Sequence, residues 1–259
     1  MKHSTLKALV FIIALALALS SVGVSGAQWT AGPRVMTAPA QVTEPRSDTE
    51  SVDAATALKW LEEGNVRWQR WQTMKRRNWG EERAANSPPK EQHPFAVVIS
   101  CMDSRVPPEL VFDRGLGDIF VIRVAGPVLD VDELASLEYA VVKKKVKLVL
   151  VLGHTNCGAV EGAVAKAPGT YLPALLEKLE PAITYVSNRY NGGNRITLSD
   201  PITPAEQTNL NRVSIANARH VHYQVLEKLL FREPGVQVKW GLYYLPTGRV
   251  AFDPTEIER

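Results

Sequence analysis

Two polar segments of the sequence carry residue types that bind metals. Cys101 follows one apolar run, and His154 and Cys157 follow another farther along the chain. Two thiolates and one imidazole form a Cys₂His set, in which zinc keeps its fourth coordination position open for chemistry. His154 and Cys157 are close enough in sequence to reach one ion across a strand-to-helix turn. These residues predict a catalytic zinc site with one Zn²⁺ per subunit.

The alternative for the same cysteines is a disulfide bond. Cys101 and Cys157 are the only 2 cysteines of the chain, and cysteine pairs in exported proteins often form disulfides. Both lie at the ends of predicted strands, however, and each has polar neighbours that suit a metal. The spacing between His154 and Cys157 is also typical of metal ligands. We therefore favour a metal site over a disulfide.

Asp103 and Arg105 follow closely after Cys101. The two side chains can form a charge-assisted pair beside the open metal position. The carboxylate would then accept a hydrogen bond from water bound to zinc and orient the lone pair that attacks. Alternatively, Asp103 is itself a metal ligand and closes the fourth position. A third reading, a capping Asp and a surface Arg, needs no metal.

Apolar runs without alternation predict the strands that position these residues. Such runs are typical of interior strands of a parallel sheet, and they cover residues 95–100, 118–125 and 147–152. Helices are predicted over 131–145, about 170–190 and 204–231, followed by strands at 236–244 and 249–252 around a turn at 246–248. The alternation predicts an α/β fold, a single domain whose central, mostly parallel sheet is flanked by helices. Ligands bind at the carboxyl ends of such strands.

A tryptophan-rich segment precedes the first strand. Ser51 is expected to cap a helix there, and the segment carries Trp60, Trp68, Trp71 and Trp79. That many indoles exceed what the face of one polar helix needs. We therefore expect this helix to pack on a partner subunit rather than only on its own domain.

The amino-terminal segment resembles a secretory signal. Lys2 and Lys7 precede an apolar run over 8–19, and small residues lead to a cleavage position between Ala27 and Gln28. An uncleaved membrane anchor is the alternative, but the run is short beside the roughly 20 residues that cross a bilayer. We expect a signal peptide over 1–27, a flexible lead-in over 28–50 and a zinc domain over 51–259. The mature protein would be exported and would have no stable membrane span. We favour a periplasm as its compartment, and a lumen or the medium are the alternatives.

Composition excludes several classes of protein. Apolar residues make up 45% and charged residues 22% of the chain, which are the proportions of a folded globular protein. The formal net charge is +3 and becomes +1 once Lys2 and Lys7 are set aside. A body so close to neutral argues against nucleic acid as a partner.

Four motifs in order give the chain a family resemblance. They are Cys101-Met-Asp-Ser-Arg-Val-Pro-Pro-Glu109, Gly117-Asp-Ile-Phe-Val-Ile-Arg123, Ser136-Leu-Glu-Tyr-Ala-Val141 and Gly153-His-Thr-Asn-Cys-Gly-Ala-Val160. Together they resemble the β-class carbonic anhydrases, and the likeness extends from about Gln92 to Gly248. It implies zinc held by Cys101, His154 and Cys157.

The resemblance also implies an activity. Asp103 and Arg105 match the family's catalytic dyad. The implied reaction is the zinc-dependent, reversible hydration of CO₂ to bicarbonate and a proton, in which zinc-bound hydroxide attacks with the dyad's assistance. The protein would then be a carbonate dehydratase, a lyase.

Four further positions match a CO₂ pocket near a dimer interface: Gln92, Phe120, Ala125 and Tyr139. Gln92 would bind bicarbonate or CO₂ from the neighbouring subunit, so the resemblance implies a homodimer or a tetramer. Val98 stands where some family members carry a Trp that is linked to a closed, bicarbonate-inhibited form. The resemblance therefore implies the open type.

The sequence departs from the family pattern at one loop. The family commonly reads Arg-Asn-Ala-Gly-Asn, whereas this chain has Arg123-Val-Ala-Gly-Pro127. The hydrogen bonds of two amide side chains must therefore be absent or replaced. Two other functions stay open from the sequence: hydrolysis of carbonyl sulfide or carbon disulfide, and a non-catalytic scaffold stabilised by zinc. The presence of Asp103 and Arg105 argues against the scaffold.

Overall fold

The computed structural model describes residues 52–72, 92–229 and 233–254. The predicted signal peptide and lead-in, the proposed cap Ser51 and the indole of Trp79 lie outside these residues. Within the described part, no helix has both the length and the apolar character that crossing a membrane requires.

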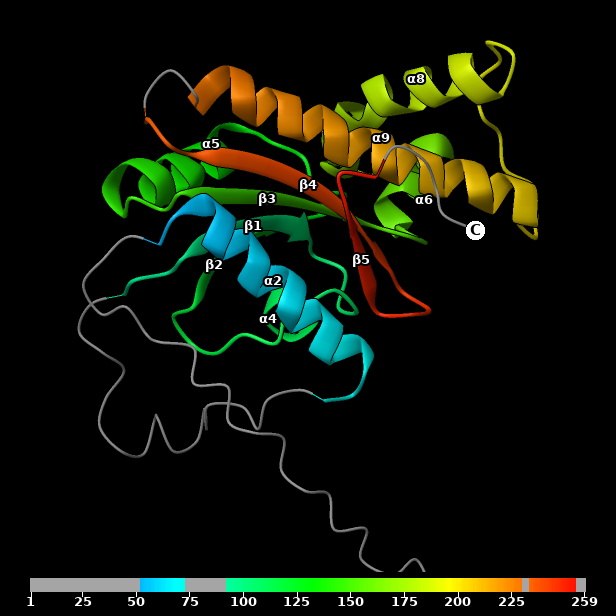
Figure 1. Ribbon diagram of the computed structural model, residues 1–259. Coiled ribbons are helices and arrows are strands. Elements are labelled where there is room, and N and C mark those ends of the chain that lie inside the picture. Colours follow the sequence, from blue (N-terminus) through cyan, green and yellow to red (C-terminus); the bar gives the residue numbers. More distant parts are fainter. Residues whose placement is uncertain (1–51, 73–91, 230–232, 255–259) are drawn as a thin grey trace, which may run out of the picture. The chain divides into compact units, whose positions relative to one another are not determined.

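The centre of the fold is a five-stranded sheet in the order β2-β1-β3-β4-β5 (Figure 1). The strands are β1 (Ala96–Cys101), β2 (Ile119–Val124), β3 (Leu148–His154), β4 (Gln237–Tyr244) and β5 (Arg249–Phe252). β1 through β4 pair in parallel, and β5 pairs antiparallel with β4. The predicted α/β class and the predicted strands are confirmed, with ends that differ by one or two residues. β1 and β3 extend far enough to include Cys101 and His154.

The helices of the described residues connect and cover these strands. They are α2 (Ala54–Gln69), α4 (Pro108–Val111), α5 (Val131–Glu138), α6 (Gly158–Val164), α7 (Leu172–Leu176), α8 (Glu180–Tyr190) and α9 (Pro204–Leu229). The helix expected over 131–145 continues past α5 as a π-helical turn, η1 (Tyr139–Lys143). The helix expected over 170–190 is interrupted by a 3₁₀ turn, η2 (Glu177–Leu179). Pro181 follows η2 and lacks the N–H that a continuous helix would need there.

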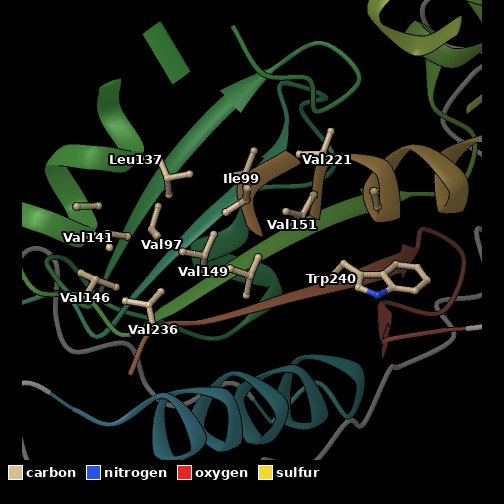
Figure 2. Packing of buried hydrophobic residues seen from close by; sticks show 14 of the residues in the cluster. Val97, Ile99, Leu137, Val141, Val146, Val149, Val151, Val221, Val236 and Trp240 are labelled. Carbon is tan, nitrogen blue, oxygen red and sulfur yellow. The ribbon is translucent and has the colours of Figure 1, made fainter. Parts of the chain in front are cut away.

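Both faces of the sheet are buried, which explains why the strands do not alternate in polarity. On one face, side chains of β1, β3 and β4 pack against α5 and α9, and Figure 2 shows Val97, Ile99 and Val151 among them. On the other face, Val98 and Leu150 pack against α2 and α4. Successive residues of a strand point to opposite faces, so each strand supplies both cores.

Helix α2 corrects one expectation, the position of its N-cap. Its N-cap is Asp53, whose carboxylate accepts hydrogen bonds from the N–H groups of Ala55 and Thr56. Its buried face packs on the sheet of its own chain, and the expected contact of this helix with a partner subunit stays a prediction. Trp60 and Trp68 are used within the chain: Trp60 meets the ring of Phe95 edge-on at 5.1 Å between centroids, and the Trp68 indole N–H donates to the Tyr243 hydroxyl.

Gly64 sets how closely α2 approaches the domain. A Cβ at this position would lie 1.8 Å from the carbonyl oxygen of Phe112. We therefore expect Gly64→Ala to lower the free energy of unfolding by about 2–3 kcal/mol, as overpacking does, measured by denaturant unfolding. The neighbouring exposed variant Glu62→Ala should stay within about 0.5 kcal/mol of wild type. Equal stability of the two variants would contradict this packing.

Candidate metal centre

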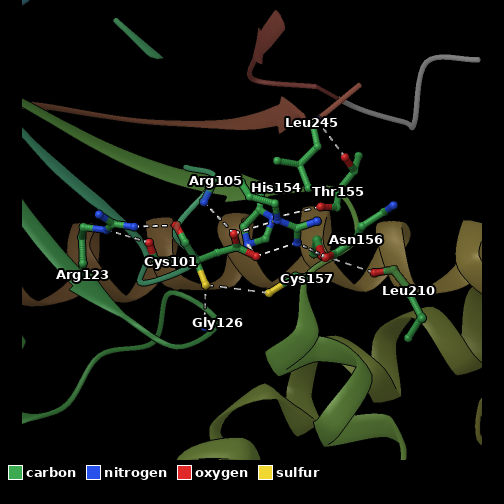
Figure 3. Close-up of polar contacts among 12 residues, drawn as sticks. Cys101, Arg105, Arg123, Gly126, His154, Thr155, Asn156, Cys157, Leu210 and Leu245 are labelled. Carbon is green, nitrogen blue, oxygen red and sulfur yellow. Dashed lines mark hydrogen bonds and ion pairs between the residues drawn. The ribbon is translucent and has the colours of Figure 1, made fainter. Parts of the chain in front are cut away.

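Neighbouring strands bring the three predicted metal ligands together. β1 ends at Cys101 and β3 at His154, and the two strands pair in parallel. Cys157 lies at the start of α6, just after the turn that follows β3. The ligand atoms of the three residues lie within 4.8 Å of one another, and all three side chains are buried. Figure 3 shows the two sulfurs side by side beneath the imidazole.

The two cysteines are free thiols in this structure. Their sulfurs lie 4.0 Å apart, at hydrogen-bonding distance. The disulfide that the sequence left as an alternative is therefore not formed. The contact also shifts both pKa values. The hydrogen bond with Cys157 is the main cause that lowers the pKa of Cys101 to about 4, and the same contact raises the pKa of Cys157. The two directions agree with a thiolate on Cys101 that is stabilised by its neighbour.

His154 presents an unpaired nitrogen to this pair. Its Nδ1 lies 2.9 Å from the carbonyl oxygen of Thr155. A carbonyl can only accept, so Nδ1 carries the proton and Nε2 carries the lone pair. Nε2 is buried and has no hydrogen-bond partner among the described residues. An acceptor nitrogen beside two sulfurs is the donor set that a soft divalent cation such as zinc satisfies. The residues therefore fit a bound metal.

Asp103 lies beside the ligands and is held by Arg105. The guanidinium donates to both carboxylate oxygens, Nε to Oδ1 at 2.9 Å and Nη2 to Oδ2 at 2.7 Å. The hydrogen bonds from Arg105 are the main cause that lowers the pKa of Asp103 to about 2. Its Oδ2 remains 4.0 Å from His154 Nε2. In this structure the Asp103 carboxylate is therefore paired with Arg105 and does not point directly at the three ligand atoms.

Sequence reasoning missed the groups that hold these segments in place. Arg123, at the end of β2, donates to the carbonyl oxygens of Cys101 and Asp103. Asn156 has a left-handed backbone with φ 55°, and its carbonyl accepts from Arg105 at 3.1 Å. The sequence does contain two signals: a charged residue near the end of an apolar run, and an Asn before Cys157, a residue type that tolerates the left-handed region. Their partners were not visible.

Only one of the expected pocket residues lies close to the metal ligands in the same chain. Ala125 follows Val124, which pairs with Cys101. Phe120 pairs instead with Val97, four residues earlier in β1, which is roughly 13 Å along the strand. Tyr139 stays with Phe120, with 6.2 Å between ring centroids.

Gln92 is farther still from the ligands. It is exposed and precedes the amino end of β1, whereas Cys101 ends that strand. The strand alone spans roughly 16 Å. Gln92, Phe120 and Tyr139 are therefore not brought to the ligands of their own chain.

Comparison with known proteins agrees with this geometry. A model of the carbonic anhydrase family matches residues 96–250. Carbonic anhydrase 2 of Mycobacterium tuberculosis is 36% identical over 180 residues, which cover 68% of this chain and 77% of that protein. A carbonic anhydrase of Mycolicibacterium smegmatis is 42% identical over 132 residues, covering 49% of this chain and 63% of that protein, slightly less than two thirds of it.

A solved structure gives the same result. The β-carbonic anhydrase CafA of Aspergillus fumigatus has a TM-score of 0.55 and 25% identity, covering 65% of this chain and 78% of that chain. The fold and the buried Cys–His–Cys set define an α/β protein in which three clustered side chains could hold a metal ion. The chain belongs to the carbonic anhydrase family, a family of lyases, and within it to the β class. The resemblance inferred from the sequence motifs is confirmed.

The ion pair between Asp103 and Arg105 makes a testable prediction. Arg105→Gln should raise the pKa of Asp103 from about 2 toward its ordinary value of 3.8, measured by carbon NMR of the carboxyl group. The pKa of Asp103 is lower in the folded chain than in the unfolded chain, so its carboxylate stabilises the folded state above pH 3.8. This stabilisation is lost as the pH falls toward 2. The variant should therefore lose less stability than wild type across that window. Arg105→Lys, which keeps the charge without the planar fork, should lie in between. An unchanged pKa in Arg105→Gln would contradict the pairing.

Proposed function

We propose that this protein catalyses the reversible hydration of CO₂ to bicarbonate and a proton, with zinc as its metal. The observation that carries the proposal is the buried set of Cys101, His154 and Cys157, whose ligand atoms lie close enough to hold one cation and include an unpartnered Nε2. Two thiolates and an imidazole suit zinc better than the harder divalent cations. When bound, zinc lowers the pKa of a coordinated water to about 7 and so supplies the nucleophile at neutral pH.

Asp103 and Arg105 supply the second part of the proposal. The pKa of Asp103 is about 2, so at neutral pH its carboxylate can only accept hydrogen bonds. Oδ2 faces the free nitrogen of His154 at 4.0 Å, and it can therefore orient the attacking water. Arg105 is itself anchored to the Asn156 carbonyl. This anchoring resists rotation of Asp103 into the fourth metal position, which supports the open type.

Asp103→Asn separates catalysis from metal binding. The amide keeps the size of the carboxylate but presents a donor as well as an acceptor, so we expect kcat for CO₂ hydration to fall at least about 100-fold. Zinc content should be unchanged. Stopped-flow hydration and metal analysis measure the two effects, and Asp132→Asn, an exposed acid of α5, is the matched control. A wild-type protein that binds zinc without hydrating CO₂ would instead support the scaffold.

The same preparation distinguishes the substrates. Carbonyl sulfide and carbon disulfide are linear triatomic molecules like CO₂, and both would release H₂S on hydrolysis. We expect CO₂ hydration to exceed H₂S release, measured side by side at matched enzyme and substrate concentrations. Faster H₂S release would show that the reaction has been assigned to the wrong substrate.

We also propose that the active protein is at least a dimer. The outer side of β2 has no strand partner within the described residues. Two large apolar residues are exposed, Tyr139 to 46% and Met102 to 63% of their surface. Exposed apolar surface beside an unpaired edge strand is typical of a subunit interface. A partner seated there is one arrangement that would bring Gln92, Phe120 and Tyr139 to the other subunit's metal.

Subunit mixing tests whether Gln92 acts across the interface. Gln92→Ala should lower kcat/KM in the homo-oligomer, and Cys101→Ser should abolish activity by removing a metal ligand. If the two variants are refolded together, mixed dimers form. In a mixed dimer the Gln92→Ala subunit keeps all three metal ligands, and its Cys101→Ser partner supplies Gln92 to that site. We therefore expect the mixture to be more active than the average of the two. Activity equal to that average would contradict a composite site.

A further inference from the structure

We propose that Asn217, in α9, is a positioning residue for the metal ligand Cys101. It holds the loop after β2 where the backbone N–H of Gly126 reaches the Cys101 sulfur. The inference rests on the metal site proposed above, but it does not depend on CO₂ being the substrate.

The loop passes tightly over Cys101. β2 ends at Val124, which pairs with Cys101, and the chain then turns at Gly126 with φ +60°. The Gly126 N–H donates to the Cys101 sulfur at 3.3 Å. A Cβ on Gly126 would lie 3.0 Å from the Cβ of Ala159 and 3.1 Å from Cδ1 of Leu179. Because the hydrogen bond to sulfur comes from one peptide group, its strength depends on how that loop is oriented.

Asn217 fixes the next residue of the loop. Its Nδ2 donates to the carbonyl oxygen of Pro127 at 2.9 Å, and only 2% of the residue is exposed. Because a carbonyl can only accept, the amide nitrogen is unambiguously the atom that faces it. Pro127 has no N–H, so this carbonyl is the one backbone group through which the residue can be held by a hydrogen bond.

Helix stability does not explain this buried amide. The Oδ1 atom of Asn217 is buried and has no hydrogen-bond partner among the described residues. A half-satisfied amide in a core is less favourable than an apolar side chain of similar size. The contact that Asn217 does make is with the loop that contacts the metal ligand. Its role is therefore in the position of that loop.

The departure of the loop from the family pattern explains why the hydrogen bond from Asn217 to Pro127 matters. Val124 and Pro127 stand where the family commonly has Asn, so the loop has no side-chain amide at either position. Asn217 supplies an amide to this loop from α9. The hydrogen bonds that the sequence leaves unaccounted for are thus replaced, in part, by a residue far along the chain.

Asn217→Leu tests the inference, because it removes the donor while nearly keeping the volume. Groups that orient metal ligands typically contribute 10- to 100-fold to metal affinity. We expect the zinc dissociation constant, measured by competition with a chelator, to rise at least about tenfold. With Co²⁺ bound instead, the thiolate-to-metal charge-transfer band should shift to lower energy, because a sulfur that loses a hydrogen bond gives up electrons more readily.

Ser214→Ala is the matched control. Ser214 is also buried in α9, but its hydroxyl donates to the Leu210 carbonyl of the same helix. This variant should keep the zinc affinity and the Co²⁺ spectrum of wild type. The free energy of unfolding of the metal-free proteins is measured alongside, and Asn217→Ala serves as a second variant if Asn217→Leu does not fold.

The outcomes are distinct. Wild-type zinc affinity and an unshifted Co²⁺ band in Asn217→Leu would overturn the inference, even if the free energy of unfolding fell. Failure of both variants to fold would overturn it too, because Asn217 would then be a structural residue. A wild type that binds zinc without hydrating CO₂ would remove the proposed function and leave this test intact. A wild type that binds neither zinc nor Co²⁺ would end both.

Discussion

The parallel pairing of β1 with β3 is the constraint on which the metal centre depends. In this register Ser100 lies opposite Leu152, so Cys101 and His154 end adjacent strands at the same edge of the sheet. Every residue of both strands is buried. A slip by one residue would turn each core side chain to the wrong face, and two-sided burial forbids it. The apolar core thus fixes the ligands with a precision that a loop alone would not give.

The ligand set is costly for the fold without its metal. The unpaired Nε2 of His154 is buried, and an unsatisfied buried polar atom costs about 1–3 kcal/mol. A cation bound by all three atoms would remove this cost, so metal binding would also stabilise the folded chain.

Some features of the fold and the site could be predicted from the sequence and others could not, and the two groups have different physical origins. The run at 147–152 predicted β3 because two-sided burial leaves an unalternating pattern, and His154 at its end followed directly. The N-cap of α2 was predicted at Ser51, but it is Asp53. Both residue types cap helices, and which of them does so here depends on where Leu61 of the helix packs against the sheet. The contacts of Trp60 with Phe95 and of Trp68 with Tyr243 could not be predicted, because residue counts do not tell which surface covers an indole. The contacts of Gly126 and Asn217 are between segments distant in sequence, and one depends on a backbone N–H that no side-chain pattern encodes.

Charge balance connects these contacts to the proposed chemistry. A dication bound by two thiolates would have no net charge, and Asp103 and Arg105 cancel each other, so these groups together would be close to neutral. In the proposed reaction, an apolar substrate would therefore approach them without electrostatic opposition. The same thiolates would reduce the electron-withdrawing power of a bound metal. The hydrogen bond from the Gly126 N–H to the Cys101 sulfur would offset part of that effect, because it stabilises the electrons of the sulfur. The position of one loop peptide would therefore adjust the acidity on which the proposed reaction depends.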